Sequence, residues 1–136
     1  MIHRRSLIVS VAVTAALPKI AMAQTKPRWQ RRADMPWATQ EVYCAVLDGK
    51  IYVAGGLIRD RLHTRINDRV GAYDPATDSW SEAARLPQPR HHPMLATAKG
   101  HLWSFGGYDR REGGEWTSMT DVWVLDGDLW RPVGQM

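Results

Sequence analysis

Cysteine, phenylalanine and long apolar runs are scarce in this chain of 136 residues. It has one cysteine and one phenylalanine. A single cysteine cannot form an internal disulfide, so packing and hydrogen bonds alone have to hold the fold together. That cysteine, Cys44, lies in the apolar run 42–47, which predicts a buried structural thiol rather than a reactive one.

The most apolar stretch of the sequence lies at the N-terminus and is too short to span a bilayer permanently. A basic start is followed by the apolar or small residues 7–17, and residues 21–23 form an A-x-A cleavage pattern. These features are typical of a secretory signal peptide, so we expect residues 1–23 to be removed and no membrane anchor to remain. The pair Arg4-Arg5 also fits a twin-arginine export signal, and general secretion is the alternative route. Either route predicts a bacterial protein that is periplasmic or secreted.

The positive charge of the chain is concentrated in this leader. The whole sequence has 18 basic and 14 acidic residues, a net charge of +4. Three of the basic residues, Arg4, Arg5 and Lys19, precede the cleavage site, and no acidic residue does. Residues 24–136 are therefore close to neutral, with 15 basic and 14 acidic side chains. The high pI gives no support to nucleic-acid binding, and we expect no nucleic-acid partner.

What the sequence does contain is an internal repeat of about fifty residues. The segment 51–56 (IYVAGG) returns as 102–107 (LWSFGG). Trp29, Trp80 and Trp130 recur at nearly the same spacing. A period of this length is typical of proteins that are built from stacked structural repeats.

Each repeat contains four short strand patterns. A dipeptide that ends in glycine separates the first two strands of each copy, because glycine accepts the positive φ of a tight hairpin turn. A polar stretch, 57–68 in the first copy and 108–120 in the second, separates strands two and three, and we expect a loop there. The expected strands are 42–47, 50–54, 70–73 and 80–86 in the first copy, and 94–98, 101–105, 122–125 and 130–133 in the second.

These motifs resemble those of the kelch family. Residues 73–80 (YDPATDSW) fit its pattern closely, and residues 125–130 are a shorter version in which leucine replaces the tyrosine. The resemblance implies an all-β fold with kelch-type β-propeller blades of four antiparallel strands. Within residues 24–136 it implies an orphan fourth strand at 28–33, a blade at 37–87 and a blade at 88–136.

Two blades do not close a propeller ring, which typically has four to eight. We therefore expect an incomplete ring. The favoured explanation is that the chain is a fragment of a larger propeller, because the sequence stops inside a motif at Met136. The alternative is a homo-oligomer, for example three chains that supply six blades, in which the strand around Trp29 completes a blade of the next chain.

Ligand-binding residues are expected on one face of such a propeller. The connections between strands two and three lie on the same face as the links between blades, and loops on a rigid scaffold are the usual place for binding residues. Arginine side chains suit carboxylates, and aromatic faces suit sugar rings and cations. The candidates for ligand binding are Arg59, Arg61, Arg90, His92, Tyr108, Arg110 and Trp116.

Two classes of function fit these residues. The favoured one is an exported, non-catalytic binding module for a glycan or a partner protein. The alternative is an enzyme similar to the kelch-type sialic-acid mutarotases of the bacterial periplasm, which implies binding of an acidic sugar by arginine and proton transfer by a carboxylate or histidine. The candidates for these catalytic roles are Glu41, Arg90, His91 and Glu115.

No cofactor and no metal are expected. His91 and His92 are neighbours in the sequence, and neighbouring strand residues point to opposite faces, so both would rarely reach one ion. A copper site of the galactose-oxidase kind is disfavoured as well, because Cys44 directly follows Tyr43. The glycine pair 55–56 is not a phosphate loop, since no Lys-Ser/Thr follows it.

Overall fold

The computed structural model describes residues 28–59, 61, 63–110 and 114–136. The chain divides into two units, residues 1–30 and residues 31–136, and every strand among the described residues lies in the second unit. Within the described residues, no helix is long and apolar enough to cross a membrane.

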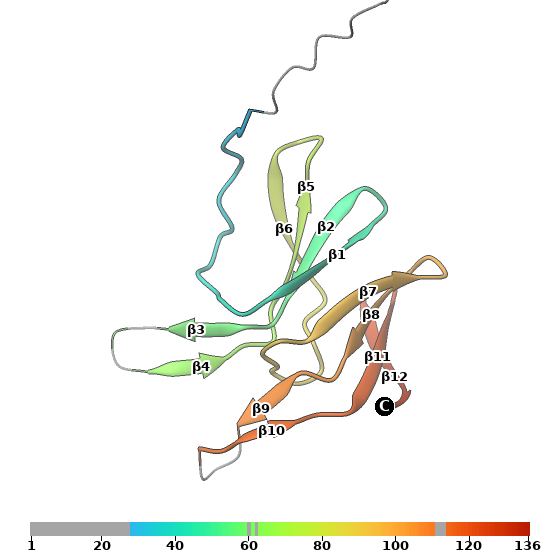
Figure 1. The fold of residues 1–136 in the computed structure, drawn as a ribbon. Coiled ribbons are helices and arrows are strands. Elements are labelled where there is room, and N and C mark those ends of the chain that lie inside the picture. The colour runs from blue at the N-terminus through green and yellow to red at the C-terminus, as the bar shows by residue number, and fades with distance from the viewer. Residues whose placement is uncertain (1–27, 60, 62, 111–113) are drawn as a thin grey trace, which may run out of the picture. The chain divides into compact units, whose positions relative to one another are not determined.

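The second unit contains two four-stranded antiparallel sheets (Figure 1). Their strands are β1 (Tyr43–Leu47), β2 (Lys50–Ala54), β5 (Val70–Asp74), β6 (Ser79–Ala83), β7 (Met94–Ala98), β8 (His101–Phe105), β11 (Asp121–Asp126) and β12 (Leu129–Gln135). The first sheet has the order β1-β2-β5-β6, and the second has the same order in its own strands, β7-β8-β11-β12. The predicted all-β fold of four-stranded antiparallel blades is confirmed, and the two blades do not close a ring.

The turns between the first two strands of each blade follow the sequence prediction. Asp48 and Gly49 have φ angles of 49° and 75°, and Lys99 and Gly100 have φ angles of 52° and 75°. Two successive positive φ angles define the type I′ turn that matches the twist of a two-residue hairpin.

Two further hairpins occupy the stretches that were expected as loops. β3 (Leu57–Arg59) pairs with β4 (Thr64–Ile66), and β9 (Tyr108–Arg110) pairs with β10 (Trp116–Ser118). The first hairpin continues the ladder of β2 and β5, because Gly55 and Gly56 still make backbone hydrogen bonds to the chain that returns. The loop prediction is therefore wrong. Three-residue strands in a charged stretch are too short for their alternation to be recognised.

A shared core lies between the two blades. β1 runs beside β7 (Figure 1), and the hydroxyl of Thr97 donates a hydrogen bond of 2.6 Å to the carbonyl oxygen of Val46 across this contact. Burying a large aliphatic side chain such as Leu95 or Leu102 in this core stabilises the fold by about 1.5–3 kcal/mol. The buried core residues are Ala54, Val70, Leu86, Leu95, Leu102 and Trp123.

The glycine pair of each repeat sits where another segment approaches closely. A Cβ at Gly55 would lie 2.2 Å from the carbonyl oxygen of Arg90, and a Cβ at Gly107 would lie 2.8 Å from that of His91. Because glycine has no Cβ, these positions let the neighbouring backbone come this close.

Cys44 is exposed, so the prediction of a buried thiol is wrong. β1 is an edge strand of its sheet, and its alternate residues Ala45 and Leu47 face the core. The side chain of Cys44 therefore points away from the packed face.

Residues 28–33 form no strand, and Trp29 is fully exposed. In both blades the fourth strand pairs with the third strand of the same blade. The described part of the chain contains no third strand that could pair with residues 28–33. Its assignment to a further blade stays a prediction.

Candidate functional site

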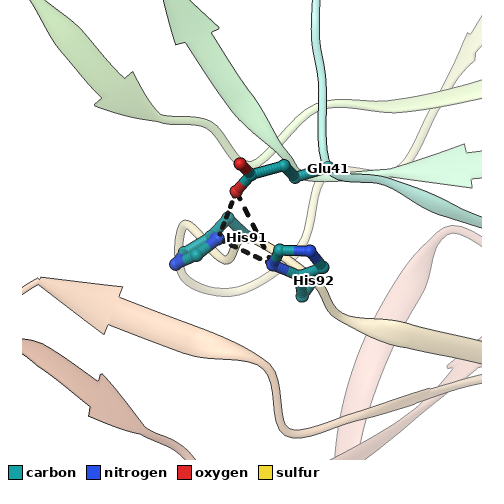
Figure 2. Close-up of side chains that lie close together, drawn as sticks. All are labelled: Glu41, His91 and His92. Carbon is teal, nitrogen blue, oxygen red and sulfur yellow. Dashed lines mark hydrogen bonds and ion pairs between the residues drawn. The ribbon is translucent and has the colours of Figure 1, made fainter.

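Three ionisable side chains meet where the chain enters the two blades (Figure 2). Glu41 precedes β1, and His91 and His92 precede β7. Nδ1 of His91 lies 3.1 Å from Oε2 of Glu41 and 3.0 Å from Nδ1 of His92. Nδ1 of His92 lies 3.7 Å from the same carboxylate oxygen. We call Glu41, His91 and His92 the His–Glu cluster.

The repeat itself creates this meeting. Glu41 and His92 occupy equivalent positions in the two repeats, 51 residues apart, and both have positive φ, 60° and 52°. The backbone N–H of His92 donates a hydrogen bond of 3.1 Å to the carbonyl oxygen of Glu41, which joins the two blade entrances. The left-handed conformation is uncommon for residues other than glycine, and it takes His92 out of the alternation of a strand. The expectation that the two histidines point to opposite faces is therefore wrong.

Aromatic rings surround the histidines. The ring centroid of His91 is 4.2 Å from that of Trp116 and 5.3 Å from that of Tyr108, and the centroid of His92 is 5.9 Å from that of Tyr43. Burial lowers the pKa of His91, and the hydrogen bond with Glu41 opposes this shift. The lowered pKa favours the neutral form of the His91 imidazole.

A cavity of about 460 Å³ opens beside the His–Glu cluster. Its size falls within the range of ligand pockets, about 300–1,000 Å³. The lining mixes aromatic rings with methionines, whose flexible side chains adapt to irregular shapes. Its main lining residues are Tyr43, His92, Met94, Phe105, Tyr108 and Met119.

Known proteins identify the repeat. A model of the Kelch motif matches residues 44–87. Beta-scruin of Limulus polyphemus is 36% identical over 87 residues, which cover 64% of this chain and 9% of that protein. Kelch-like protein terF of Aspergillus terreus is 39% identical over 70 residues, which cover 51% of this chain and 15% of that protein. The chain belongs to the kelch-repeat family.

One further curated protein with a kelch name and one solved structure also resemble this chain. Kelch-like protein 35 of Mus musculus is 33% identical over 91 residues, which cover 67% of this chain and 14% of that protein. The solved "Structure of YjhT" matches with a TM-score of 0.68 and 17% identity, over 80% of this chain and 42% of that chain. At this identity the likeness shows a shared fold alone. The chain spans between 9% and 15% of the length of the three curated relatives named here.

Arg90, a candidate for both binding and catalysis, is enclosed by the kelch scaffold. Its side chain is 0% exposed. The guanidinium donates hydrogen bonds of 2.8 Å to the side chain of Gln88 and 3.1 Å to Asp121, and it lies over the ring of Trp123. These contacts hold the link between the blades to β11. Arg90 does not line the cavity, which weighs against its predicted contact with a ligand.

The remaining candidates lie on the hairpins β3–β4 and β9–β10 and are exposed. Arg59 and Arg61 belong to the first hairpin, where Arg59 lines a separate hollow of about 200 Å³. On the second hairpin, the guanidinium of Arg110 lies 5.5 Å from the ring centroid of Trp116, which directly follows Glu115. The structure therefore gathers Glu41, His91, His92, Tyr108 and Trp116 at one place. Arg59 and Arg61 are on the other hairpin, and their roles stay predictions.

Sequence reasoning missed the apolar part of the cavity. Met94, Phe105 and Met119 line it, yet each lies at a position that reads as ordinary strand or loop. No charge or spacing marks such residues. The equivalence of Glu41 and His92 in the repeat was the one signal that pointed to the His–Glu cluster.

Proposed function

We propose that this chain is a protein-binding module of an exported kelch propeller, and that the cavity beside the His–Glu cluster receives a side chain or short segment of the partner. The observation that carries the proposal is the lining of that cavity by aromatic rings and methionines. Met-rich surfaces accommodate varied protein partners, and aromatic side chains dominate the energetics of protein interfaces.

A glycan is the other ligand class, and the same cavity supports it less well. The faces of Tyr43 and Tyr108 suit a sugar ring, but sugar recognition also needs several fixed polar groups. The exposed arginines Arg59, Arg61 and Arg110 are not among the residues that line the cavity. The apolar lining therefore favours a protein segment.

Selection from a displayed peptide library on the folded chain tests this proposal. We expect selected peptides to lose at least about tenfold in affinity when Tyr108→Ala removes a ring at the cavity wall. Leu129→Ala is the matched control, because Leu129 is exposed on β12 and does not line the cavity. Peptides that bind the wild type and Tyr108→Ala equally would contradict the proposal. Binding of glycans alone on an array run in parallel would replace the protein ligand with a sugar.

The export part of the proposal rests on residues 1–23. A reporter fused after residue 30 should appear outside the cytoplasm of a bacterial host. If the twin-arginine route is used, the double substitution Arg4→Lys with Arg5→Lys should keep the reporter inside, since that route requires the arginine pair. Continued export of the double variant would assign general secretion. A cytoplasmic reporter in both cases would refute export.

We also propose that the two blades act within a larger ring. A blade needs a neighbour on each side to bury its faces, and here each blade has the other on one side only. Large side chains of β12, Leu129 and Val133, remain exposed. Light scattering behind a sizing column, with circular dichroism on the same peak, should show no discrete folded trimer. A discrete trimer with a β-sheet spectrum would support self-assembly of three chains instead.

One observation supports the enzymatic alternative. Oε2 of Glu41 and Nδ1 of His91 lie 3.1 Å apart next to the cavity, a separation that permits proton transfer between them. The enclosed guanidinium of Arg90 leaves an acidic sugar without the partner expected for its carboxylate. Proton NMR of sialic-acid anomers decides the matter, because an unchanged interconversion rate with folded protein would exclude this activity.

A further inference from the structure

We propose that Glu41, His91 and His92 form a binding site for a divalent transition-metal ion, with Zn²⁺ as the ion that best suits the donors. Imidazole nitrogen and carboxylate oxygen are both established zinc ligands. The proposal does not depend on which macromolecule the cavity binds. It revises the sequence-based expectation of no metal, which assumed that the two histidines diverge.

The distances between the three donor atoms suit a tetrahedral ion. In a tetrahedral zinc site with bonds of about 2.0–2.1 Å, neighbouring donor atoms lie about 3.3 Å apart. The corresponding separations in the cluster are 3.0 Å between the two Nδ1 atoms, and 3.1 Å and 3.7 Å from these atoms to Oε2 of Glu41. A point about 2 Å from all three donors therefore exists without rearrangement of the side chains.

Protons alone satisfy these atoms poorly. Each neutral imidazole carries one N–H, and a carboxylate has only acceptor oxygens. If Nδ1 of His91 carries a proton, this single proton faces two acceptors, Oε2 of Glu41 and Nδ1 of His92. If the proton is on His92 instead, the lone pair of His91 Nδ1 faces the carboxylate. A cation at the centre resolves both conflicts, because it accepts all three lone pairs at once.

The backbone around the cluster is held in an uncommon conformation. Glu41 and His92 supply two of the three donors, and both have left-handed φ angles. Strained residues of this kind cluster at functional sites, where the surrounding structure holds them in place. The backbone hydrogen bond from His92 to Glu41 holds the main chains of these two donor residues together.

An ion can reach this site and keep one position open. The side chains of Glu41 and His92 are 39% and 35% exposed, whereas that of His91 is 9% exposed. His92 also lines the 460 Å³ cavity. Three protein donors with a fourth position free is the arrangement of zinc sites that take water or a ligand group. The open position would accept a carboxylate, imidazole or thiolate from whatever occupies the cavity.

Isothermal titration calorimetry of the untagged full chain with Zn²⁺ tests the proposal. We expect one ion per chain. Cobalt(II) should give the visible absorption bands of a four-coordinate N/O site. His92→Asn removes an imidazole donor but keeps a residue that tolerates left-handed backbone. Glu41→Gln removes the carboxylate without changing its shape. Each should weaken Zn²⁺ binding by more than about 100-fold, since loss of a mere outer partner already costs 10–100-fold.

His101→Gln is the matched control. His101 lies on β8 with its Nδ1 near the carbonyl oxygen of Leu125, outside the cluster. This variant should bind Zn²⁺ as the wild type does, and circular dichroism should show that all variants fold. If His92→Asn does not fold, Glu41→Gln decides by itself. No saturable binding by the folded wild type, or equal binding by the wild type and the folded cluster variants, would overturn the proposal.

Discussion

The indole Nε1 of Trp130 donates a hydrogen bond of 2.8 Å to the carbonyl oxygen of Ala84, and so ties the outermost strand of the second blade to the end of the first. The first blade repeats this contact, because Nε1 of Trp80 donates a hydrogen bond of 3.0 Å to the carbonyl oxygen of Ala33. Ala33 and Ala84 are 51 residues apart, which is the period of the repeat. Ala33 therefore occupies the position that follows the fourth strand in the next repeat, which is consistent with the predicted fourth-strand role of residues 28–33.

Replacing Trp130 with phenylalanine should destabilise the unit. The ring stays large and apolar, but the carbonyl oxygen of Ala84 loses its donor, so we expect the free energy of unfolding to fall by about 1 kcal/mol. Denaturant unfolding followed by circular dichroism measures this loss. Trp29→Phe is the control, since Trp29 is fully exposed and its replacement should leave stability unchanged. Equal stability of Trp130→Phe and the wild type would show that the contact is not stabilising.

The strands of both blades could be predicted from the sequence because each signal occurs twice. A turn such as Asp48-Gly49 is a modest signal alone, but it gains weight when Lys99-Gly100 returns at the same place in the next repeat. Strand alternation then fixes the register around these turns. The short hairpins β3–β4 and β9–β10 lacked this support, because their sequences differ between the two repeats.

The candidate site could be predicted only in part, and the reason is the backbone. His91, His92 and Glu41 were recognised as candidates, yet their convergence depends on two left-handed residues that strand periodicity does not anticipate. For Arg90, the sequence suggests a ligand contact that the fold does not support. An arginine next to two histidines suggests a ligand contact, and only the fold reveals that its guanidinium is buried against Asp121.

Gly55→Ala should be far more damaging than Gly49→Ala. Both glycines have positive φ, 65° and 75°, so both substitutions bear the cost of left-handed backbone, about 1 kcal/mol. Nothing lies within 4 Å of a Cβ at Gly49, whereas a Cβ at Gly55 would lie 2.2 Å from the carbonyl oxygen of Arg90. We expect Gly55→Ala to lose at least about 3 kcal/mol. Comparable unfolding midpoints for the two variants would disprove the close approach.

Asn67 is a structural residue that the sequence did not single out. Its buried amide donates hydrogen bonds of 2.8 Å and 3.0 Å to the carbonyl oxygens of Gly55 and Gly56, and its Oδ1 accepts one of 2.9 Å from the N–H of Arg69. Asn67→Ala removes these three hydrogen bonds and takes the acceptor of 2.9 Å away from the N–H of Arg69, so the free energy of unfolding should fall by about 2 kcal/mol. Gln40→Ala removes an exposed amide and should cost much less. Similar losses for both variants would argue against this role.

Tyr73→Phe should raise the pKa of Asp78. The phenol of Tyr73 donates a hydrogen bond of 2.6 Å to Oδ1 of Asp78. This bond is the main reason that the pKa of the Asp78 carboxyl lies below its ordinary value, and the N–H of Ala33 adds to the effect. Without the phenol, the N–H of Ala33 and the charge of Arg32 still lower the pKa, so it should move only part of the way back. Carboxyl-carbon NMR titration measures the shift, and Tyr52→Phe is a control that should leave Asp78 unchanged.

The same hydrogen bond predicts how stability responds to acid. Asp78 has a lower pKa in the folded chain than in the unfolded chain, so its contribution is fully present above the unfolded pKa, near 4. It is lost as the pH falls through the folded pKa, because the protonated carboxyl no longer favours the folded state. The wild type should therefore lose more stability than Tyr73→Phe as the pH falls from 5 to below the folded pKa of Asp78. Parallel stability curves for the two proteins over that range, together with an unchanged pKa for Asp78, would show that the phenol does not stabilise the carboxylate.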